Sequence, residues 1–162
     1  PIMGIDLLWF EKKQKLVAIL DFQPLVQDQE YFDRYFDGLK RLKKSFTDFN
    51  SDIKSNIYDP SKYFSPWTLF CKGGNSEVEK ILPKVFTSFL KCYWLNLDLS
   101  KANQNKIKSE KVRLLHIEYD KYSAEKDPAH GLFSGFFGKE WSDKYMKEFL
   151  FPLSLEDSNY LL

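Results

Sequence analysis

Apolar residues dominate the first 22 positions of this 162-residue chain, and one polar stretch interrupts them. Residues 1–10 and 15–22 are each almost continuously apolar, and residues 11–14, Glu-Lys-Lys-Gln, separate the two runs. Short apolar runs joined by a polar turn are typical of a β-hairpin, and apolar residues at successive positions indicate strands covered on both faces. The pattern therefore predicts a buried hairpin at the start of the chain.

A single carboxylate, Asp6, lies within the first apolar run. A turn centred on residues 12 and 13 would pair Asp6 with Ile19, and Asp21 would then lie on the same face one pair further along. A register slip of one residue would put the two acids on opposite faces. Because burial of a charge is costly, a carboxyl in apolar surroundings tends to stay protonated near neutral pH, as a proton donor must.

Apolar residues recurring at threes and fours predict helices further along the chain. We expect helices over residues 28–49, 76–97, 102–124 and 140–151, and a strand over residues 67–72. Pro83 should kink or restart the second helix, since proline cannot donate a backbone hydrogen bond. The polar segment between the first helix and the strand is expected to be a long surface connection, and residues 153–162 a loose C-terminal tail.

The charge and composition of the chain limit the kinds of molecule that it is expected to bind. The net charge is +1, so no overall field favours nucleic acid or an acidic membrane surface. One basic cluster, residues 40–44, has two interpretations: the solvated end of a helix, or a docking patch for an acidic protein. Hydrophobic residues make up 43% and aromatic residues 17% of the chain. An aromatic core of this kind could be packing alone or could hold a flat ligand.

The cysteines and the apolar runs indicate the cellular environment in which the chain is expected to fold. Cys71 and Cys92 are too far apart for a CxxC site, and we interpret them as reduced thiols. Neither a signal peptide nor an apolar run of membrane-spanning length is present, so the sequence predicts a soluble protein.

A second acid, Asp127, precedes a segment in which glycines alternate with phenylalanines. Such a segment can be a mobile flap over an apolar ligand with Asp127 at its hinge. Alternatively, Asp127 caps a helix that has Pro128 at its first position, which is the commoner arrangement. The sequence contains no phosphate-binding glycine loop, HExxH or GxSxG motif, and no metal-ligand spacing, so Asp6 and Asp127 are the main candidates for chemistry.

Nine short motifs, in order along nearly the whole chain, carry a family resemblance. Four are shared family-wide: Gly4-Ile-Asp6, Asp21-Phe-Gln-Pro24, Asp127-Pro-Ala-His-Gly131 and Phe149-Leu-Phe151. Five more fit one branch: Asp6-Leu-Leu-Trp-Phe10, Gln14-Lys-Leu-Val-Ala18, Phe22-Gln-Pro-Leu-Val-Gln-Asp28, Tyr31-Phe-Asp-Arg-Tyr-Phe36 and Leu69-Phe-Cys-Lys-Gly-Gly74. As a set, they resemble the ferredoxin-dependent bilin reductases.

This resemblance implies an α/β fold, an α/β/α sandwich with a central antiparallel sheet flanked by helices. It implies one bilin reductase domain over residues 1–162 with an open-chain tetrapyrrole between the sheet and the C-terminal helices. Members are typically longer at the N-terminus. The expectation is therefore that a portion of the domain precedes Pro1, and that the fragment could be inactive alone.

Site residues are also implied by the resemblance, position by position. Asp6 resembles the family's sheet aspartate, a proton donor beside the pyrrole rings, and Asp127 its second aspartate. Lys72 resembles a basic strand-end position that pairs with a bilin propionate in some members. The resemblance further implies substrate contacts at three other positions: Phe22, Cys71 and Leu132.

The implied activity is the two-electron reduction of biliverdin to 15,16-dihydrobiliverdin by proton-coupled single-electron steps. No bound metal or flavin is implied, and reduced ferredoxin is the external electron donor. An upstream haem oxygenase or a downstream bilin reductase are further candidate partners of a monomer in the cytoplasm, or in the plastid stroma of an alga. Two alternatives stay open: formation of phycoerythrobilin by another branch, and a non-catalytic bilin carrier or chaperone.

Overall fold

The structure is a computed structural model of the chain, and it describes residues 1–74, 76–102 and 109–156. Its contacts form two compact units. Unit 1 comprises Pro1–Lys54 and Ser61–Gln104, and unit 2 comprises Ser55–Pro60 and Asn105–Leu162. Unit 1 holds a sheet with helices and unit 2 is helical, so the predicted mixture of helices with an antiparallel sheet is confirmed.

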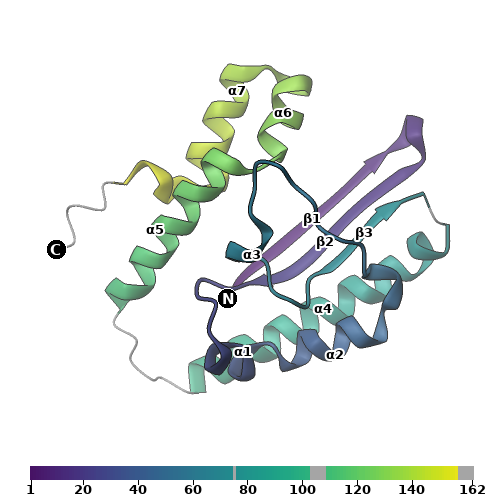
Figure 1. Cartoon of the computed structure of the whole chain (residues 1–162), viewed down its shortest axis with the longest axis vertical. Coiled ribbons are helices and arrows are strands. Elements are labelled where there is room, and N and C mark those ends of the chain that lie inside the picture. The colour runs from purple at the N-terminus through teal and green to yellow at the C-terminus, as the bar shows by residue number, and fades with distance from the viewer. Residues whose placement is uncertain (75, 103–108, 157–162) are drawn as a thin grey trace. The chain divides into compact units, whose positions relative to one another are not determined.

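Unit 1 is built on a three-stranded antiparallel sheet in the order β1-β2-β3 (Figure 1). Its strands are β1 (Ile2–Phe10), β2 (Lys15–Gln23) and β3 (Leu69–Gly73), and the short helix η1 (Glu11–Lys13) makes the turn between β1 and β2. Gln14 completes this turn in the left-handed region at φ 46°. The predicted hairpin and its register are confirmed, because Asp6 pairs with Ile19.

Alternation along the strands gives the sheet two different faces. One, here called the core face, is buried on β2 and β3, where it carries Leu16, Ala18, Leu20, Phe22, Leu69 and Cys71. On β1 the same face carries the exposed Leu7 and Trp9. The other, here called the open face, carries Gly4, Asp6, Leu8, Phe10, Lys15, Val17, Ile19, Asp21, Phe70 and Lys72. Its middle residues on β1 and β2 are half-buried or exposed.

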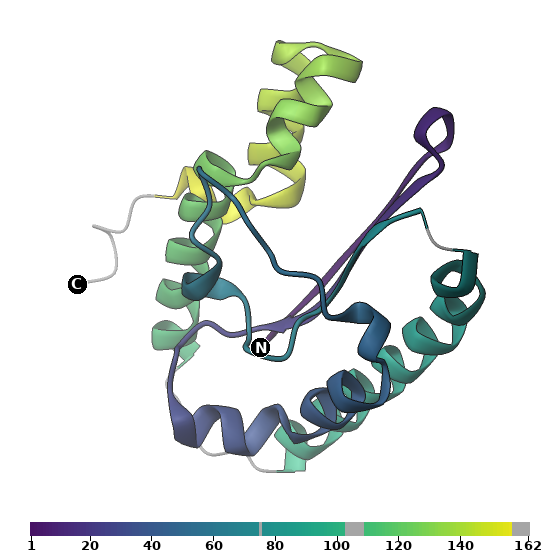
Figure 2. The same cartoon turned by 45° about the vertical axis from the view of Figure 1, so that its right-hand side comes forward.

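Three helices of unit 1 pack on the core face: α1 (Gln29–Tyr35), α2 (Asp37–Ser45) and α4 (Ser76–Ala102). Figure 2 shows all three on one side of the sheet. One apolar cluster with the strands is completed by Leu39, Val78, Val85 and Phe89 of these helices and by Phe36, which lies between α1 and α2. Helices α2 and α4 approach closely at Gly38, where an added Cβ would lie 2.2 Å from Cys92 Sγ. Any larger residue there would require the Cys92 side chain to move.

The prediction of one continuous helix over residues 28–49 is wrong. This segment is divided into α1, α2 and the 3-10 helix η2 (Thr47–Phe49), with Phe36 between the first two at φ −110° and ψ −2°. Phe36 is fully buried, and its ring contacts Phe22 and Trp67. Tertiary packing therefore fixes this residue in a conformation that ends α1. In contrast, α4 continues through Pro83 and does not restart.

Strand β1 is not buried, which corrects the prediction of a hairpin covered on both faces. None of its residues is buried, Asp6 is exposed, and Leu7 and Trp9 are 43% and 46% exposed. Within the described residues β1 pairs only with β2, so it is an edge strand. The helices pack mainly on β2 and β3. An apolar sequence pattern alone does not indicate on which strand the helices will pack.

Unit 2 consists of α5 (Ser109–Lys126), α6 (Ala129–Phe137), α7 (Lys139–Lys144), the π-helix η3 (Tyr145–Leu150) and the 3-10 helix η4 (Pro152–Leu155). The predicted helix 140–151 thus corresponds to two elements. The N–H of Leu153 donates to Asp120 Oδ2 at 2.9 Å, which fixes η4 to α5. The first residues of the predicted loose tail are therefore in a helix, and residues 157–162 lie outside the described part. The short helix α3 (Pro60–Tyr63) belongs to the long connection before β3.

Candidate functional site

The open face brings two of the predicted site residues together, Asp6 and Lys72. Asp6, Ile19 and Phe70 form one cross-strand row. Leu8, Val17 and Lys72 form the next row. With strands about 4.8 Å apart and residues on one face about 6.7 Å apart along a strand, the Cα atoms of Asp6 and Lys72 are roughly 12 Å apart. A carboxylate and an ammonium thus flank half-buried aliphatic side chains.

Asp21 lies on the same face as Asp6 but is fully buried. Ser65 donates to it twice, from N–H to Oδ2 at 2.8 Å and from Oγ–H to Oδ1 at 2.6 Å. Burial raises the pKa of Asp21 to about 6, while hydrogen bonds from Ser65 and Thr68 act in the opposite direction. Register reasoning identified the face of Asp21 but assigned it no role, because its partner is 44 residues away in the chain.

Phe22 and Cys71, two of the predicted substrate contacts, lie on the core face and are therefore separated from Asp6 and Lys72 by the sheet itself. The Phe22 ring packs against Phe89 at a centroid distance of 5.1 Å. Burial raises the pKa of the Cys71 thiol, so this group is a neutral part of the core. Both residues support the sheet from behind.

Asp127 lies in unit 2, between α5 and α6. Its Oδ1 accepts a hydrogen bond from the N–H of Ala129 at 2.8 Å, so the side chain does cap the start of α6. Burial raises the pKa of this carboxyl, and the Ala129 hydrogen bond and the nearby His130 oppose that rise. The helix-cap interpretation of Asp127 is therefore favoured over that of a flap hinge, and the same carboxyl is biased toward its protonated form.

The glycine and phenylalanine segment after Asp127 is the helix α6, and Leu132, a predicted substrate contact, is half-buried within it. Rings of α6, α7 and η3 form a continuous series. Phe137 contacts Trp141 at 4.7 Å, and Trp141 stacks on Tyr145 at 4.7 Å. Tyr145 in turn stacks on Phe149. The phenylalanines therefore belong to an ordered aromatic surface of unit 2.

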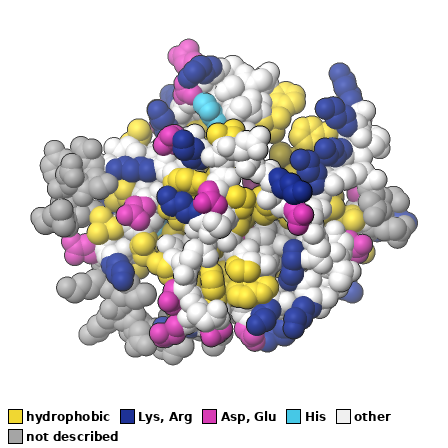
Figure 3. Space-filling model, viewed as in Figure 1, with side chains coloured by type: hydrophobic (Ala, Val, Ile, Leu, Met, Phe, Trp, Pro, Cys, Tyr) yellow, Lys and Arg dark blue, Asp and Glu magenta, His cyan; other side chains and the backbone are white. Residues whose placement is uncertain are grey.

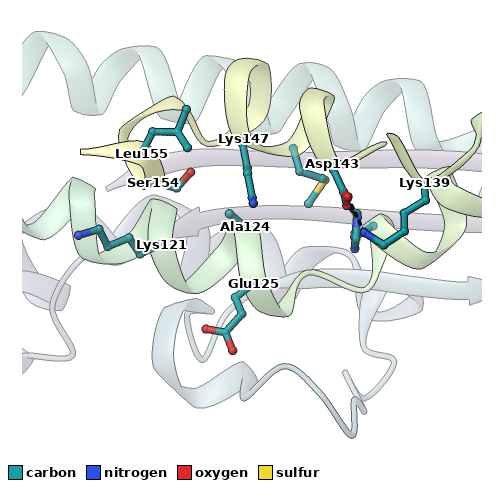
Figure 4. A pocket seen from close by; sticks show the side chains of 10 residues that line it. Lys121, Ala124, Glu125, Lys139, Asp143, Lys147, Ser154 and Leu155 are labelled. Atoms are coloured by element: carbon teal, nitrogen blue, oxygen red, sulfur yellow. Dashed lines mark hydrogen bonds and ion pairs between the residues drawn. The ribbon is translucent and has the colours of Figure 1, made fainter. Parts of the chain in front are cut away.

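A cavity of about 580 Å³ lies within unit 2, between α5, α6 and the elements that follow them (Figure 4). Side chains of both charges line it, among them Lys121, Glu125, His130, Lys139, Asp143 and Lys147. Asp143 pairs with His130 Nε2 at 2.7 Å and with Lys139. Neither Asp127 nor Leu132 lines this cavity, so it is distinct from the site that the sequence predicts.

The basic cluster on α2 is largely engaged in structure. Lys43 donates to the carbonyl of Phe49 at 2.9 Å and also to that of Thr68. Lys40 lies over the Trp67 ring, 5.6 Å from its centroid, and Arg41 pairs with Asp37. The interpretation of this cluster as part of the fold is thus favoured over a docking patch. Figure 3 shows basic and acidic side chains interspersed over one face of the molecule.

The described residues, 1–74, 76–102 and 109–156, contain neither a membrane-spanning helix nor a cluster of potential metal ligands. None of the helices in this part of the chain is long and apolar enough to cross a membrane. Within the same residues, no group of three or more His, Cys, Asp or Glu side chains is placed to hold a metal ion.

Comparison with known proteins gives consistent matches. The family described as ferredoxin-dependent bilin reductase matches residues 1–152. A 15,16-dihydrobiliverdin:ferredoxin oxidoreductase of Prochlorococcus marinus (strain NATL1A) is 85% identical over 159 residues, which are 98% of this chain and 67% of that protein. The protein of the same name from Synechococcus sp. (strain CC9902) is 55% identical over 154 residues, covering 95% of this chain and 66% of its own length. The chain thus spans about two thirds of the length of these relatives.

Among the solved structures that are similar in fold is that of phytochromobilin synthase from tomato in complex with biliverdin. It superposes with a TM-score of 0.69 over 89% of this chain and 53% of its own chain, at 19% sequence identity. At this identity the likeness concerns the fold alone.

Proposed function

Since the chain belongs to the ferredoxin-dependent bilin reductase family, we propose that it reduces biliverdin to 15,16-dihydrobiliverdin with electrons from reduced ferredoxin. The observation that carries this proposal is the 85% identity to a protein of that name, over 98% of the chain. The reaction adds two electrons and two protons at the methine bridge between the C and D rings. Ferredoxin carries one electron at a time, so the reduction passes through a bilin radical.

The open face supplies the chemistry that such a reaction requires of unit 1. Its half-buried Leu8, Val17 and Ile19 provide an apolar surface on which the flat rings of a tetrapyrrole can lie. Asp6 is in the row next to Leu8 and Val17, where a carboxyl can donate a proton to a ring system lying on that surface. We assign Asp6 as the first proton donor and Lys72 as a partner of a bilin propionate.

Asp127 is proposed as the second proton donor. The support is its raised pKa, which increases the fraction of the acid form at neutral pH. Leu132, in α6 beyond it, is proposed as a substrate contact. The family match extends from residue 1 to residue 152, so we propose that both units are parts of one bilin reductase domain. Phe22 and Cys71 are assigned an indirect role, since they pack behind the sheet.

Ferredoxin supplies the electrons in this scheme, so the reaction requires no bound metal or flavin. A reaction that opens the haem ring must supply the biliverdin, and a second bilin reductase must consume the dihydrobiliverdin; these are the expected neighbouring activities. We propose that the chain acts as a monomer in the cytoplasm, in keeping with the cyanobacterial relatives.

The direct test is anaerobic incubation of the protein with biliverdin, ferredoxin and a system that reduces ferredoxin. Absorbance spectra and product chromatography should show loss of biliverdin and formation of a product that co-elutes with 15,16-dihydrobiliverdin. Binding of biliverdin without any reduction would contradict the enzymatic function and favour a carrier. A product reduced at the A ring would instead identify a different branch of the family.

The Asp6→Asn variant tests the assigned proton donor. An amide of the same size cannot donate the proton, so we expect turnover to fall by about 100-fold or more while biliverdin binding stays within a few-fold of wild type. A bilin radical should accumulate and be visible by electron spin resonance. Asp33→Asn, an exposed acid of α1, is the matched control and should turn over normally. Wild-type turnover of Asp6→Asn would remove Asp6 from the mechanism.

A further inference from the structure

Two lysines occupy the hairpin end of the open face. Lys72 shares a row with Leu8 and Val17, and Lys15 pairs with Phe10 in the following row. These positions are one strand and one row apart, which places their Cα atoms roughly 8 Å from each other. Both side chains therefore stand on the same face of the sheet as Asp6, at one end of the apolar surface.

Neither ammonium group has an ion-pair partner within the part of the chain that the structure describes. The acids of the face, Asp6 and Asp21, lie in rows nearer its opposite end. The open face thus has carboxyls toward one end and two lysines at the other, with Leu8, Val17 and Ile19 between. Such a separation of charge matches a ligand that is apolar over most of its length and anionic along one edge.

We propose that Lys15 is a positioning residue that binds one propionate of biliverdin while Lys72 binds the other. This inference rests on the proposed function and extends it to the orientation of the substrate. Biliverdin carries two propionate groups on its two inner pyrrole rings, so a single lysine leaves one carboxylate without a cation. The lysine stems and the propionate arms are flexible and together span the separation of the two positions. The clamp orients the ring system on the apolar surface, with Asp6 against the rings.

Pairs of this kind are moderate in strength, because water and salt screen them. We therefore expect each lysine to change affinity by about 3- to 10-fold, with a smaller effect at high salt. The lysines of the turn, Lys12 and Lys13, belong to η1 and not to the sheet face. Lys12→Gln is thus a charge-matched control for Lys15→Gln.

The experiment measures binding of biliverdin and of its dimethyl ester, in which both carboxylates are neutral, to the full chain. Wild type should bind the free acid about 10-fold or more tightly than the ester. Lys15→Gln should weaken binding of the acid by about 3- to 10-fold and leave binding of the ester nearly unchanged. Lys15→Arg should restore the preference, and Lys12→Gln should resemble wild type. In turnover, Lys15→Gln should raise KM for biliverdin with kcat nearly unchanged, since the pair is formed equally in ground and transition states.

Equal weakening of acid and ester by Lys15→Gln would overturn this assignment, because a structural defect does not distinguish the two ligands. So would a Lys15→Gln variant that keeps the full preference for the acid. These outcomes differ from failure of the proposed function, in which wild type does not reduce biliverdin at all. The unfolding midpoint of each variant, compared with wild type, reports any loss of folded protein.

Discussion

The two faces of the sheet differ in how deeply their side chains are buried and in which residue types they carry. On the core face, Leu16, Ala18, Leu20 and Phe22 of β2 are all buried against helices. On the open face of the same strand, Val17 and Ile19 are half-buried, and the neighbouring strands contribute the exposed Asp6 and Lys72. Alternate residues of one strand therefore differ in their surroundings: one set is buried in the core, and Val17 and Ile19 of the other set stay half-buried.

A second comparison, between two acids of the open face, shows how much tertiary contacts matter. Asp6 and Asp21 lie in adjacent rows, yet Asp6 is exposed and Asp21 is fully buried. The difference arises from the connection before β3, whose Ser65 reaches Asp21 with two hydrogen bonds. We conclude that Asp21 fastens this connection to the sheet, whereas Asp6 remains exposed.

The largest effect on stability is expected on the core face. Phe22→Ala removes a ring that is 0% exposed and contacts Phe36, Phe89 and Tyr93, so it should lower the free energy of unfolding by about 3–5 kcal/mol. Urea denaturation measures this loss. Phe136→Ala, which removes a ring that is 69% exposed, is the matched control and should cost less than about 1 kcal/mol. Similar losses in both variants would contradict the assignment of the core face.

The next effect depends on pH and concerns Asp21. Its pKa rises from 3.8 to about 6 in the folded protein, so the folded state holds the proton more tightly than the unfolded state. The wild type therefore loses stability as pH rises from about 4 to above 6, and at about 1.4 kcal/mol per pKa unit the loss approaches about 3 kcal/mol. Asp21→Asn does not titrate. We expect the stability of this variant to improve relative to wild type by up to that amount over the same pH range.

Thermal or urea unfolding of both proteins at pH 4, 5, 6 and 7 checks this expectation. At pH 4, the difference in stability between Asp21→Asn and wild type reflects the altered hydrogen bonds with Ser65. The way this difference changes with pH reports the ionisation of Asp21. A stability difference that stays constant across this range, or that moves in the opposite direction, would show that Asp21 is not a buried acid with a raised pKa.

The smallest effect on stability is expected at the open face. Lys72 is exposed and has no ion-pair partner within the described residues, so Lys72→Gln should change the free energy of unfolding by no more than about 0.5 kcal/mol. Its effect should instead be on affinity for biliverdin. A loss of several kcal/mol on unfolding would mean that this residue supports the sheet, and the contrast between the faces would then be incorrect.

The sequence by itself was enough to predict the hairpin and the alternation along β2, and the structure selected the expected register over a slip of one residue. These features depend on neighbours in the chain: the turn at Glu11–Gln14 fixes the pairing, and the period of a strand fixes which residues share a face. The sequence motifs were also enough to indicate the family. The site roles that the family implies for Asp6, Asp127 and Lys72 stay predictions. The grouping of Asp6 with Lys72 followed once the register of β3 was known.

Only the tertiary structure decided which face is covered, which strand lies at the edge, and where the helices end. An apolar pattern records that residues prefer burial, but the partner that buries them comes from elsewhere in the chain. The helices packed on β2 and β3 therefore place Phe22 and Cys71 in the core. The buried Phe36 divides the predicted first helix, and Ser65 buries Asp21 from 44 residues away. Local periodicity cannot encode such contacts, because each depends on packing between distant segments.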